Sequence, residues 1–299
     1  MNIEDVLKKI IKKGETVLDV GGYVGDVAWF MTRCVGPHGK VFSFEPHPEK
    51  FKALNAKAAT CSNLNAFHCA ISNSSSPVEL YFGATDKRAQ ASTICAELAT
   101  SDRFEEDVHS VEVSATTLDR FCSDHGLHPS VIKIDTEGAE PLVLEGADTI
   151  LKTMPVLIFE LGTEENIPGH LAELRARGYT LYFVDVHRFV SVPVSWDHTV
   201  NTETRALRNS IIAFDDDEAN RIMPFLANVL AVVPHKHAPL LSGLRVVTLA
   251  EALPHFADPK KSFGRKIKHL VRRLLIPTAL DDRFPGLVVT LRNLANRIL

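Results

Sequence analysis

The sequence predicts an α/β fold in which a mostly parallel sheet of seven strands carries helices on both faces, followed by a C-terminal helical extension. Three observations predict this class. Short apolar runs alternate with amphipathic stretches along residues 14–214, a glycine-rich turn follows the first run, and an acidic segment follows a later one. Strands that alternate with helices of about 10–15 residues form βαβ units, and the strands of such units run parallel.

The first part of the chain alternates regularly. β-Branched and aromatic residues predict its strands, and apolar residues at helical spacing predict its helices. The predicted strands are 16–20, 40–45 and 66–71, and the predicted helices are 26–35 and 48–59. Apolar residues at helical spacing predict a short amphipathic helix within residues 1–13. A signal peptide is not expected there, because charged residues interrupt the apolar core that it needs.

The alternation is interrupted in the middle of the chain. Residues 78–82 and 111–114 are predicted to be strands of a local sheet extension. The stretch between them, 83–110, is polar and uneven, so we expect a surface loop or lid. Loops of this length are uncommon in compact domains unless they carry function.

The alternation then resumes. Helices are predicted at 117–125, 139–152 and 167–177, and strands at 130–135, 155–161, 180–185 and 210–214. No clear helix separates the last two strands, which suits a sheet with one antiparallel edge strand. We therefore expect one domain over residues 1–216 and a helical extension over 217–299.

The composition limits the function classes. Of 299 residues 45% are hydrophobic and 23% are charged, as in soluble globular proteins, and the net charge of −4 argues against a nucleic-acid partner. The five cysteines form no CxxC pair and no zinc-ligand spacing, so we expect free thiols, no structural metal and a cytoplasmic protein. No apolar run approaches the roughly 20 residues that span a bilayer.

The turn after the first predicted strand is the first candidate binding site. Asp19 ends the strand, and Gly21, Gly22 and Gly25 allow a tight turn and a close approach of backbone to a ligand. The helix that follows begins with free N–H groups, which can hold a carboxylate. In a parallel sheet, ligands bind outside the carboxyl ends of the strands.

Two cofactor classes compete for this turn. A dinucleotide fingerprint would require glycine at positions 20, 22 and 25, and Val20 occupies the first of these. The charge of Asp19 would repel a pyrophosphate, whereas it would favour the ammonium and sulfonium groups of S-adenosylmethionine. The residues therefore favour S-adenosylmethionine, and a nicotinamide-dependent oxidoreductase is the alternative.

Carboxylates follow two further strands. Glu45, at the end of the second strand, can accept hydrogen bonds from the ribose hydroxyls of either cofactor. Asp135 and Glu137 follow a buried strand and can both face the crevice, because residues two apart share one side of an extended chain. The alternative is that Glu137 and Glu140 only stabilise the positive N-terminus of the next helix.

Five segments together resemble the FkbM family of methyltransferases. They are VLDVGGYVG, FSFEP, TTLDRF, IKIDTEGAEPLVLEGA and PVLIFEL, of which the fourth is the most specific. The resemblance implies a class I methyltransferase fold of the Rossmann type that uses S-adenosylmethionine. It also implies O-methylation of a hydroxyl on a sugar, a glycolipid or a secondary metabolite.

The resemblance matches Asp19, Gly21, Gly25 and Glu45 to the family's cofactor site, and an alcohol nucleophile needs a base as it attacks the methyl group. Asp135 is the expected catalytic base, with Glu137 assisting or positioning the substrate, and Gly138 matches the same motif. The expected cofactor-binding residues are Asp19, Gly21, Gly22, Gly25, Glu45 and Ala70. One departure is the stretch 22–24, Gly-Tyr-Val, where many members carry an asparagine and other polar residues.

Several alternatives stay open at this point. His68, His109 and His187 are rival bases, since histidine titrates near neutrality. Oxygen ligands from Asp135, Glu137 and Glu160 could instead gather around a magnesium ion, although we predict no metal. Arg88 and Arg103 are candidates for acceptor recognition, or else belong to a solvated surface loop. A non-catalytic partner protein that keeps the fold is a further alternative.

The C-terminal segment carries its own pattern. Residues 260–276 contain seven basic residues and no acidic ones, with apolar residues on one helical face. This is the pattern of a helix lying on a membrane surface, so peripheral membrane contact is one expectation. Packing against the core or a subunit contact is the other. The expected partner is a small-molecule or glycan acceptor, and an oligomer is compatible with the sequence.

Overall fold

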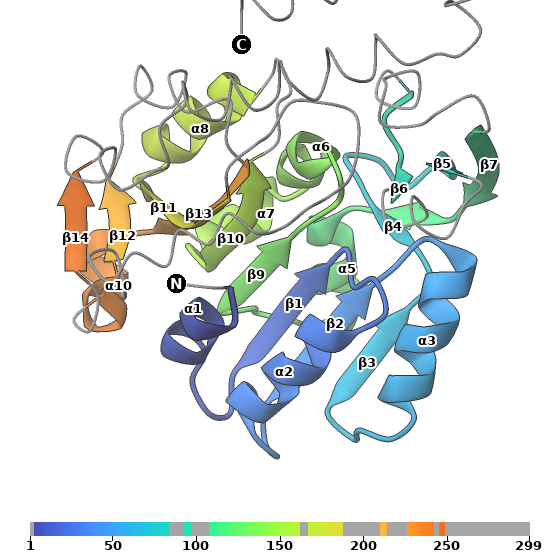
Figure 1. Cartoon of the computed structure of the whole chain (residues 1–299), viewed down its shortest axis with the longest axis horizontal. Coiled ribbons are helices and arrows are strands. Elements are labelled where there is room, and N and C mark those ends of the chain that lie inside the picture. The colour runs from blue at the N-terminus through green and yellow to red at the C-terminus, as the bar shows by residue number, and fades with distance from the viewer. Residues whose placement is uncertain are drawn as a thin grey trace, which may run out of the picture.

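A nine-stranded sheet forms the centre of the protein in the computed structural model, which describes residues 3–83, 92–96, 108–161, 167–187, 210–213, 226–241 and 245–248 (Figure 1). From one edge to the other the strands are β3 (Leu64–Phe67), β2 (Lys40–Phe44), β1 (Thr16–Val20), β9 (Val131–Ile134), β10 (Val156–Leu161), β13 (Leu226–Val232), β11 (Thr180–His187), β12 (Ser210–Ala213) and β14 (Arg245–Thr248). The five strands from β3 to β10 run parallel. The predicted α/β class with a mostly parallel sheet is confirmed.

The antiparallel part of the sheet differs from the prediction. β13 lies between β10 and β11 and runs antiparallel to both, so a reversed strand stands inside the sheet, and β12 and β14 run in the same reversed direction. The strand predicted at 210–214 is β12, which pairs antiparallel with β11 and continues the sheet to β14. The described sheet therefore has nine strands where the sequence predicts seven. β13 escapes prediction because Val229, Leu230 and Val232 are fully buried, and a continuous apolar run does not distinguish a strand from a helix.

The sheet also continues past residue 216, where we expect the helical extension to begin. β13, the helix α10 (Pro234–Leu241) and β14 all come from residues assigned to that extension. The basic segment 260–276 lies outside the described residues. No helix in the described part of the chain has the length and apolarity needed to cross a membrane.

Helices cover the sheet on both faces, as predicted (Figure 1). One face packs against α1 (Ile3–Ile10), α2 (Asp26–Val35), α3 (Pro48–Ala58) and α10. The other packs against α5 (Leu118–His125), α6 (Glu140–Glu145), α7 (Asp148–Lys152) and α8 (Ile167–Ala176). Along β1 the apolar side chains alternate between the two cores, with Val17 on the α2 side and Leu18 on the α5 side.

Two small sheets lie beside the main one. The strand predicted at 66–71 is divided: β3 ends at Phe67, and β4 (Ala70–Ile71) pairs with β8 (Ala115–Thr116). The predicted sheet extension is a separate antiparallel sheet of β6 (Ser92–Thr93), β5 (Val78–Gly83) and β7 (Val108–Val113). Thus β6 interrupts the predicted loop of 83–110. Residues 84–91 and 97–107 of that loop, which include Arg88 and Arg103, lie outside the described residues.

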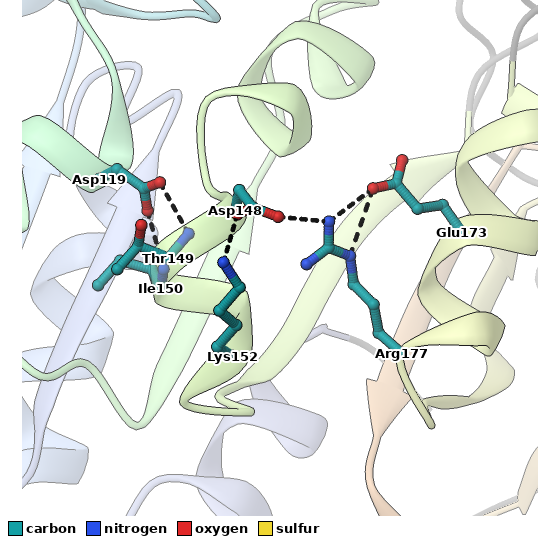
Figure 2. A network of polar contacts seen from close by, with 7 residues as sticks. All are labelled: Asp119, Asp148, Thr149, Ile150, Lys152, Glu173 and Arg177. Atoms are coloured by element: carbon teal, nitrogen blue, oxygen red, sulfur yellow. Dashed lines mark hydrogen bonds and ion pairs between the residues drawn. The ribbon is translucent and has the colours of Figure 1, made fainter.

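The helix predicted at 139–152 is broken into α6 and α7 at Gly146. A Cβ on Gly146 would lie 2.2 Å from the carbonyl oxygen of Ser72, so the backbone there packs too closely for a larger residue. Asp119 of α5 holds the start of α7, because its carboxylate accepts from the N–H groups of Thr149 (2.7 Å) and Ile150 (2.8 Å). Figure 2 shows this contact beside the ion pairs of Asp148 with Lys152 and Arg177, and of Arg177 with Glu173.

Candidate cofactor and active site

The turn after β1 is held against the ends of both neighbouring strands. The N–H groups of Gly21 and Gly22 donate to the Phe44 carbonyl at the end of β2 (3.0 and 2.8 Å). Gly21 has φ of +80°, and a Cβ there would lie 1.7 Å from the Asp135 carbonyl oxygen after β9. Gly25 precedes α2 as its N-cap with φ of +86°. The chain's own packing therefore requires glycine at position 21, and the predicted turn is confirmed in place.

Asp19 lies inside the sheet and not in the crevice. Its side chain is fully buried, accepts a hydrogen bond from the Ser43 hydroxyl (2.7 Å) and forms an ion pair with the Lys133 ammonium (3.2 Å). Oδ1 receives no well-directed hydrogen bond from the described residues, so the Lys133 contact is an ion pair alone. From the sequence we expect a free negative charge at this position. The structure corrects that expectation, because Lys133 compensates the charge, and Asp19 supports the turn from within.

Lys133 connects three parts of the site. Its ammonium lies 3.2 Å from Asp19 and 3.3 Å from Asp135, and it donates to the Gly21 carbonyl at 2.9 Å. Burial lowers the pKa of this lysine, but the carboxylates of Asp135 and Asp19 outweigh burial and hold the pKa above its ordinary value. The Asp135 side chain is 40% exposed. It is thus an accessible carboxylate next to the turn, as predicted from its place after β9.

Glu45 ends β2 beside the same turn. Only 4% of the residue is exposed, and its two oxygens accept from the backbone N–H groups of Tyr23 (2.7 Å) and His47 (2.8 Å). Burial raises the pKa of Glu45 above its ordinary value, against the lowering effect of these hydrogen bonds and of Lys50. The hydrogen bond to Tyr23 helps to hold that residue at a φ of +50°, which is unusual for a side chain of this size.

Lys50 of α3 is a site residue that the sequence reading missed. It is 7% exposed, its ammonium donates to the Ser92 hydroxyl (3.0 Å), and it lies 5.1 Å from the centre of the Tyr23 ring. Burial lowers its pKa, whereas the charges of Glu45 and Glu137 act in the opposite direction. A usable signal was its spacing of four residues from Leu54, which places a lysine on the buried face of the helix.

The acidic segment after β9 folds around Glu140. This carboxylate, 4% exposed, accepts from the backbone N–H groups of Thr136 (2.6 Å) and Gly138 (3.0 Å) and from the Thr136 hydroxyl. Glu140 therefore has a structural role, in which its carboxylate holds the loop that precedes α6, whereas the expected stabilisation of the helix N-terminus stays a prediction. Glu137 stands at the tip of the segment with φ of +56° and is half-buried, close enough to Lys50 to act on its pKa.

The other candidate residues are dispersed. His68 hydrogen-bonds the Pro46 carbonyl (3.0 Å) and stacks on Phe51, which is a packing role. His109 lies in β7 near Phe82, and the side chain of His187, at the end of β11, is outside the described part. Ala70 packs in β4 against Leu80 and Val113, so its predicted cofactor contact stays a prediction. All five cysteines are free thiols, as predicted. The described residues hold no group of three or more His, Cys, Asp and Glu side chains suited to a metal ion.

Comparison with solved structures finds similar methyltransferases at low identity. The chain resembles the precorrin-6y C5,15-methyltransferase of Geobacter metallireducens GS-15 at 10% identity and a TM-score of 0.40, over 76% of this chain and 85% of that one. It resembles the methyltransferase FkbM of Methylobacillus flagellatus KT at 15% identity and a TM-score of 0.34, over 49% of this chain and 32% of that one. The fibrillarin of Aeropyrum pernix, solved with S-adenosyl-L-methionine, is 13% identical over 75% of this chain and 68% of that one, with a TM-score of 0.38.

A search of curated proteins gave no match. A family model, by contrast, matches more than half of the sequence. It is that of the methyltransferase FkbM domain, and it covers residues 19–181. These residues run from Asp19 at the end of β1 to Leu181 in β11, and so include the turn, Glu45 and the acidic segment. The chain belongs to the FkbM family of methyltransferases.

Proposed function

We propose that this methyltransferase uses S-adenosylmethionine and methylates a hydroxyl group of a sugar, a glycolipid or a secondary metabolite. The observation that carries the proposal is the buried carboxylate of Glu45 beside the glycine turn. Family membership supports methyl transfer. The methyl donor and the hydroxyl target are the parts that need experiment.

The residues around the turn fit a nucleoside. A carboxylate offers about four acceptor positions on its two oxygens. In Glu45 the N–H groups of Tyr23 and His47 occupy one position on each oxygen. One further position on each oxygen suits the two hydroxyls of a ribose, as the acidic residue does in other nucleotide sites.

The charge balance around the turn favours a cationic ligand over a diphosphate. The site groups the carboxylates of Asp19, Glu45, Asp135 and Glu137 with the ammonium groups of Lys50 and Lys133. Negative charge is therefore in excess even though Asp19 itself is compensated. A sulfonium and an ammonium are attracted by this excess, whereas a pyrophosphate is repelled. The preference for a cationic cofactor, which the sequence suggests from Asp19 alone, thus rests on all six charged groups together.

Asp135 is the residue proposed to accept the proton of the acceptor hydroxyl. Bound S-adenosylmethionine would supply a methyl group on a positively charged sulfur. Asp135 is accessible, and Lys133 fixes one of its oxygens at 3.3 Å. A positioned base of this kind contributes about 10²–10⁴-fold to a rate. Glu137, at the tip of the acidic segment, is proposed to orient the acceptor.

Ligand binding tests the donor. S-adenosylhomocysteine should raise the melting temperature of the protein, and NAD should not, because a ligand stabilises the native state it binds. Glu45→Ala should weaken the affinity for S-adenosylhomocysteine in calorimetry. Glu49→Ala is the matched control, since Glu49 is an exposed carboxylate of the same region paired with Lys52. Stabilisation by NAD alone, or equal affinity of the two variants, would remove the assignment.

Methyl transfer tests the base and the acceptor class. Mass spectrometry of glycans and metabolites treated with the protein and S-adenosylmethionine should find a product heavier by one methyl group. With that acceptor, Asp135→Asn should keep the affinity for S-adenosylhomocysteine and slow turnover by about 10²–10⁴-fold. Unchanged turnover would exclude Asp135 as the base. Tight donor binding with no methylated product would favour the alternative of a non-catalytic partner protein.

A further inference from the structure

A row of polar side chains crosses the middle of the sheet just below the crevice. Ser43 of β2, Asp19 of β1 and Lys133 of β9 are register partners on three neighbouring parallel strands. All three are buried, with exposed fractions between 0% and 5%. The Ser43 hydroxyl and the Lys133 ammonium contact the Asp19 carboxylate from opposite sides. Buried charges are costly, so a charged pair in this position calls for a role beyond packing.

Lys133 reaches further than the neutralisation of Asp19 requires. Its ammonium also donates to the carbonyl of Gly21, the first residue of the cofactor turn, at 2.9 Å. It contacts Asp135, two residues further along its own strand direction, at 3.3 Å. The ammonium donates a hydrogen bond to the Gly21 carbonyl, and the Asp19 and Asp135 carboxylates lie within ion-pair distance of the same ammonium. The turn and Asp135 are also in direct backbone contact, because Gly21 has no side chain to separate them.

We propose that Lys133 is a positioning residue that joins the cofactor turn to Asp135, so that one buried ammonium sets both the donor side and the acceptor side of the active site. The inference rests on the proposed function, which assigns the turn to the cofactor and Asp135 to the acceptor. The simpler alternative is that Lys133 only neutralises Asp19. The two roles predict different effects of removing Lys133 from a protein in which residue 19 carries no charge.

The test first removes the negative charge of Asp19, so that a cation is no longer required to neutralise it. Asp19→Asn is compared with the double variant Asp19→Asn/Lys133→Met, in which neither the asparagine nor the methionine carries a charge. Two quantities are measured on the full chain. One is the affinity for S-adenosylhomocysteine by calorimetry, and the other is the labelling of Asp135 by a water-soluble carbodiimide and an amine, read by mass spectrometry. Ser43→Ala is the control for the labelling, because the Ser43 hydroxyl bonds Asp19 and forms no hydrogen bond to Asp135 among the described residues.

The double variant should melt close to Asp19→Asn, label Asp135 several times faster and bind S-adenosylhomocysteine about tenfold more weakly, the typical effect of losing a hydrogen bond to a charged group. Ser43→Ala should label Asp135 like the wild type. If either the labelling or the affinity of the double variant equals that of Asp19→Asn, Lys133 does not join the two parts and the proposal is overturned.

Two further outcomes stay decisive. If the double variant does not fold, Lys133→Arg takes its place, because arginine keeps the positive charge but not the three contacts. Faster labelling of Asp135 in Lys133→Arg than in the wild type then supports positioning, and equal labelling supports neutralisation alone. If the wild type does not bind S-adenosylhomocysteine, the proposed function fails, and the labelling of Asp135 alone decides the role of Lys133.

Discussion

Two polar networks in this protein use the same residue types in opposite surroundings. Lys133 and Asp19 pair inside the sheet with exposed side-chain fractions of 6% and 0%, whereas Lys152 and Asp148 pair on the helical layer with 67% and 54% exposed (Figure 2). Exposed pairs gain little, because water competes for both charges and holding two long side chains costs entropy. Buried pairs roughly recover their desolvation cost when intact and lose heavily when one partner is removed. The comparison assigns the surface network to helix packing and the buried one to the geometry of the site.

The largest expected difference between the networks comes from Lys133→Met. The change leaves the buried Asp19 carboxylate without its cation, and we expect a loss of about 3–5 kcal/mol in the free energy of unfolding. Urea denaturation measures it. Lys152→Met is the matched control in the surface network and should cost far less. Equal losses in the two variants would mean that burial does not separate the two networks.

The next effect concerns Glu45 and pH. Burial holds the pKa of Glu45 above its ordinary value, so its carboxylate takes up a proton at a higher pH than an exposed glutamate. As the pH falls through that raised pKa, the affinity for S-adenosylhomocysteine should fall by up to about tenfold per pH unit. For the ligand-free protein, the contribution of Glu45 to the free energy of unfolding increases as the pH falls, because the folded state binds this proton more tightly than the unfolded state does. Calorimetry across the acid range should show the decline in the wild type, and Glu45→Gln should bind weakly with no such decline.

A smaller effect is expected at the start of α7. Asp119→Ala removes the acceptor for the N–H groups of Thr149 and Ile150, so the protein should lose about 0.5–2 kcal/mol of stability, as when a helix cap is lost. Asp124→Ala, on the same helix in an exposed pair with Arg120, is the control. Thermal and urea unfolding of both variants measure the difference. Equal stability would show that Asp119 does not cap α7 in solution.

The smallest effect is expected for Arg177→Gln. Arg177 joins Asp148 and Glu173 at the surface, where half or more of each acidic side chain is exposed. Its removal should change the free energy of unfolding by less than about 1 kcal/mol, and added salt should reduce even that difference. A loss as large as that of Lys133→Met, at either low or high salt, would contradict the comparison.

The sequence predicts those parts of the site that a short local pattern reports. The turn from Asp19 to Gly25, the carboxylate of Glu45 and the segment that begins at Asp135 each follow a strand, and parallel strands bring such ends to one edge of the sheet. The buried row is different. Its members Ser43, Asp19 and Lys133 meet only through the register of three strands, which no local pattern reports.

Other differences have equally local causes. β13 reads as an apolar run of uncertain type, because it is buried on both faces between β10 and β11. Residues 139–152 have the apolar spacing of one helix, but Gly146 packs on the Ser72 carbonyl and divides it. Asp19 does end the first strand as a carboxylate, but it is buried and Lys133 compensates its charge. The sequence does not show that Lys133 lies beside it.

The pairing of β4 with β8 has a consequence for the tolerance of the fold to changes in chain length. The chain leaves the central fold at Ile71 and returns at Ala115, and these two points are held side by side by the pairing of Ala70 with Ala115 and of Ile71 with Thr116. The segment between these two points, which includes the small sheet of β5, β6 and β7, therefore begins and ends at the pairing of β4 with β8. Lengthening a loop whose ends are already fixed costs only about 0.6 kcal/mol per doubling. Insertions between β4 and β8 should therefore cost the fold little, provided that the β4–β8 pairing and the contacts of Ser72 and Ser92 with the central fold are kept.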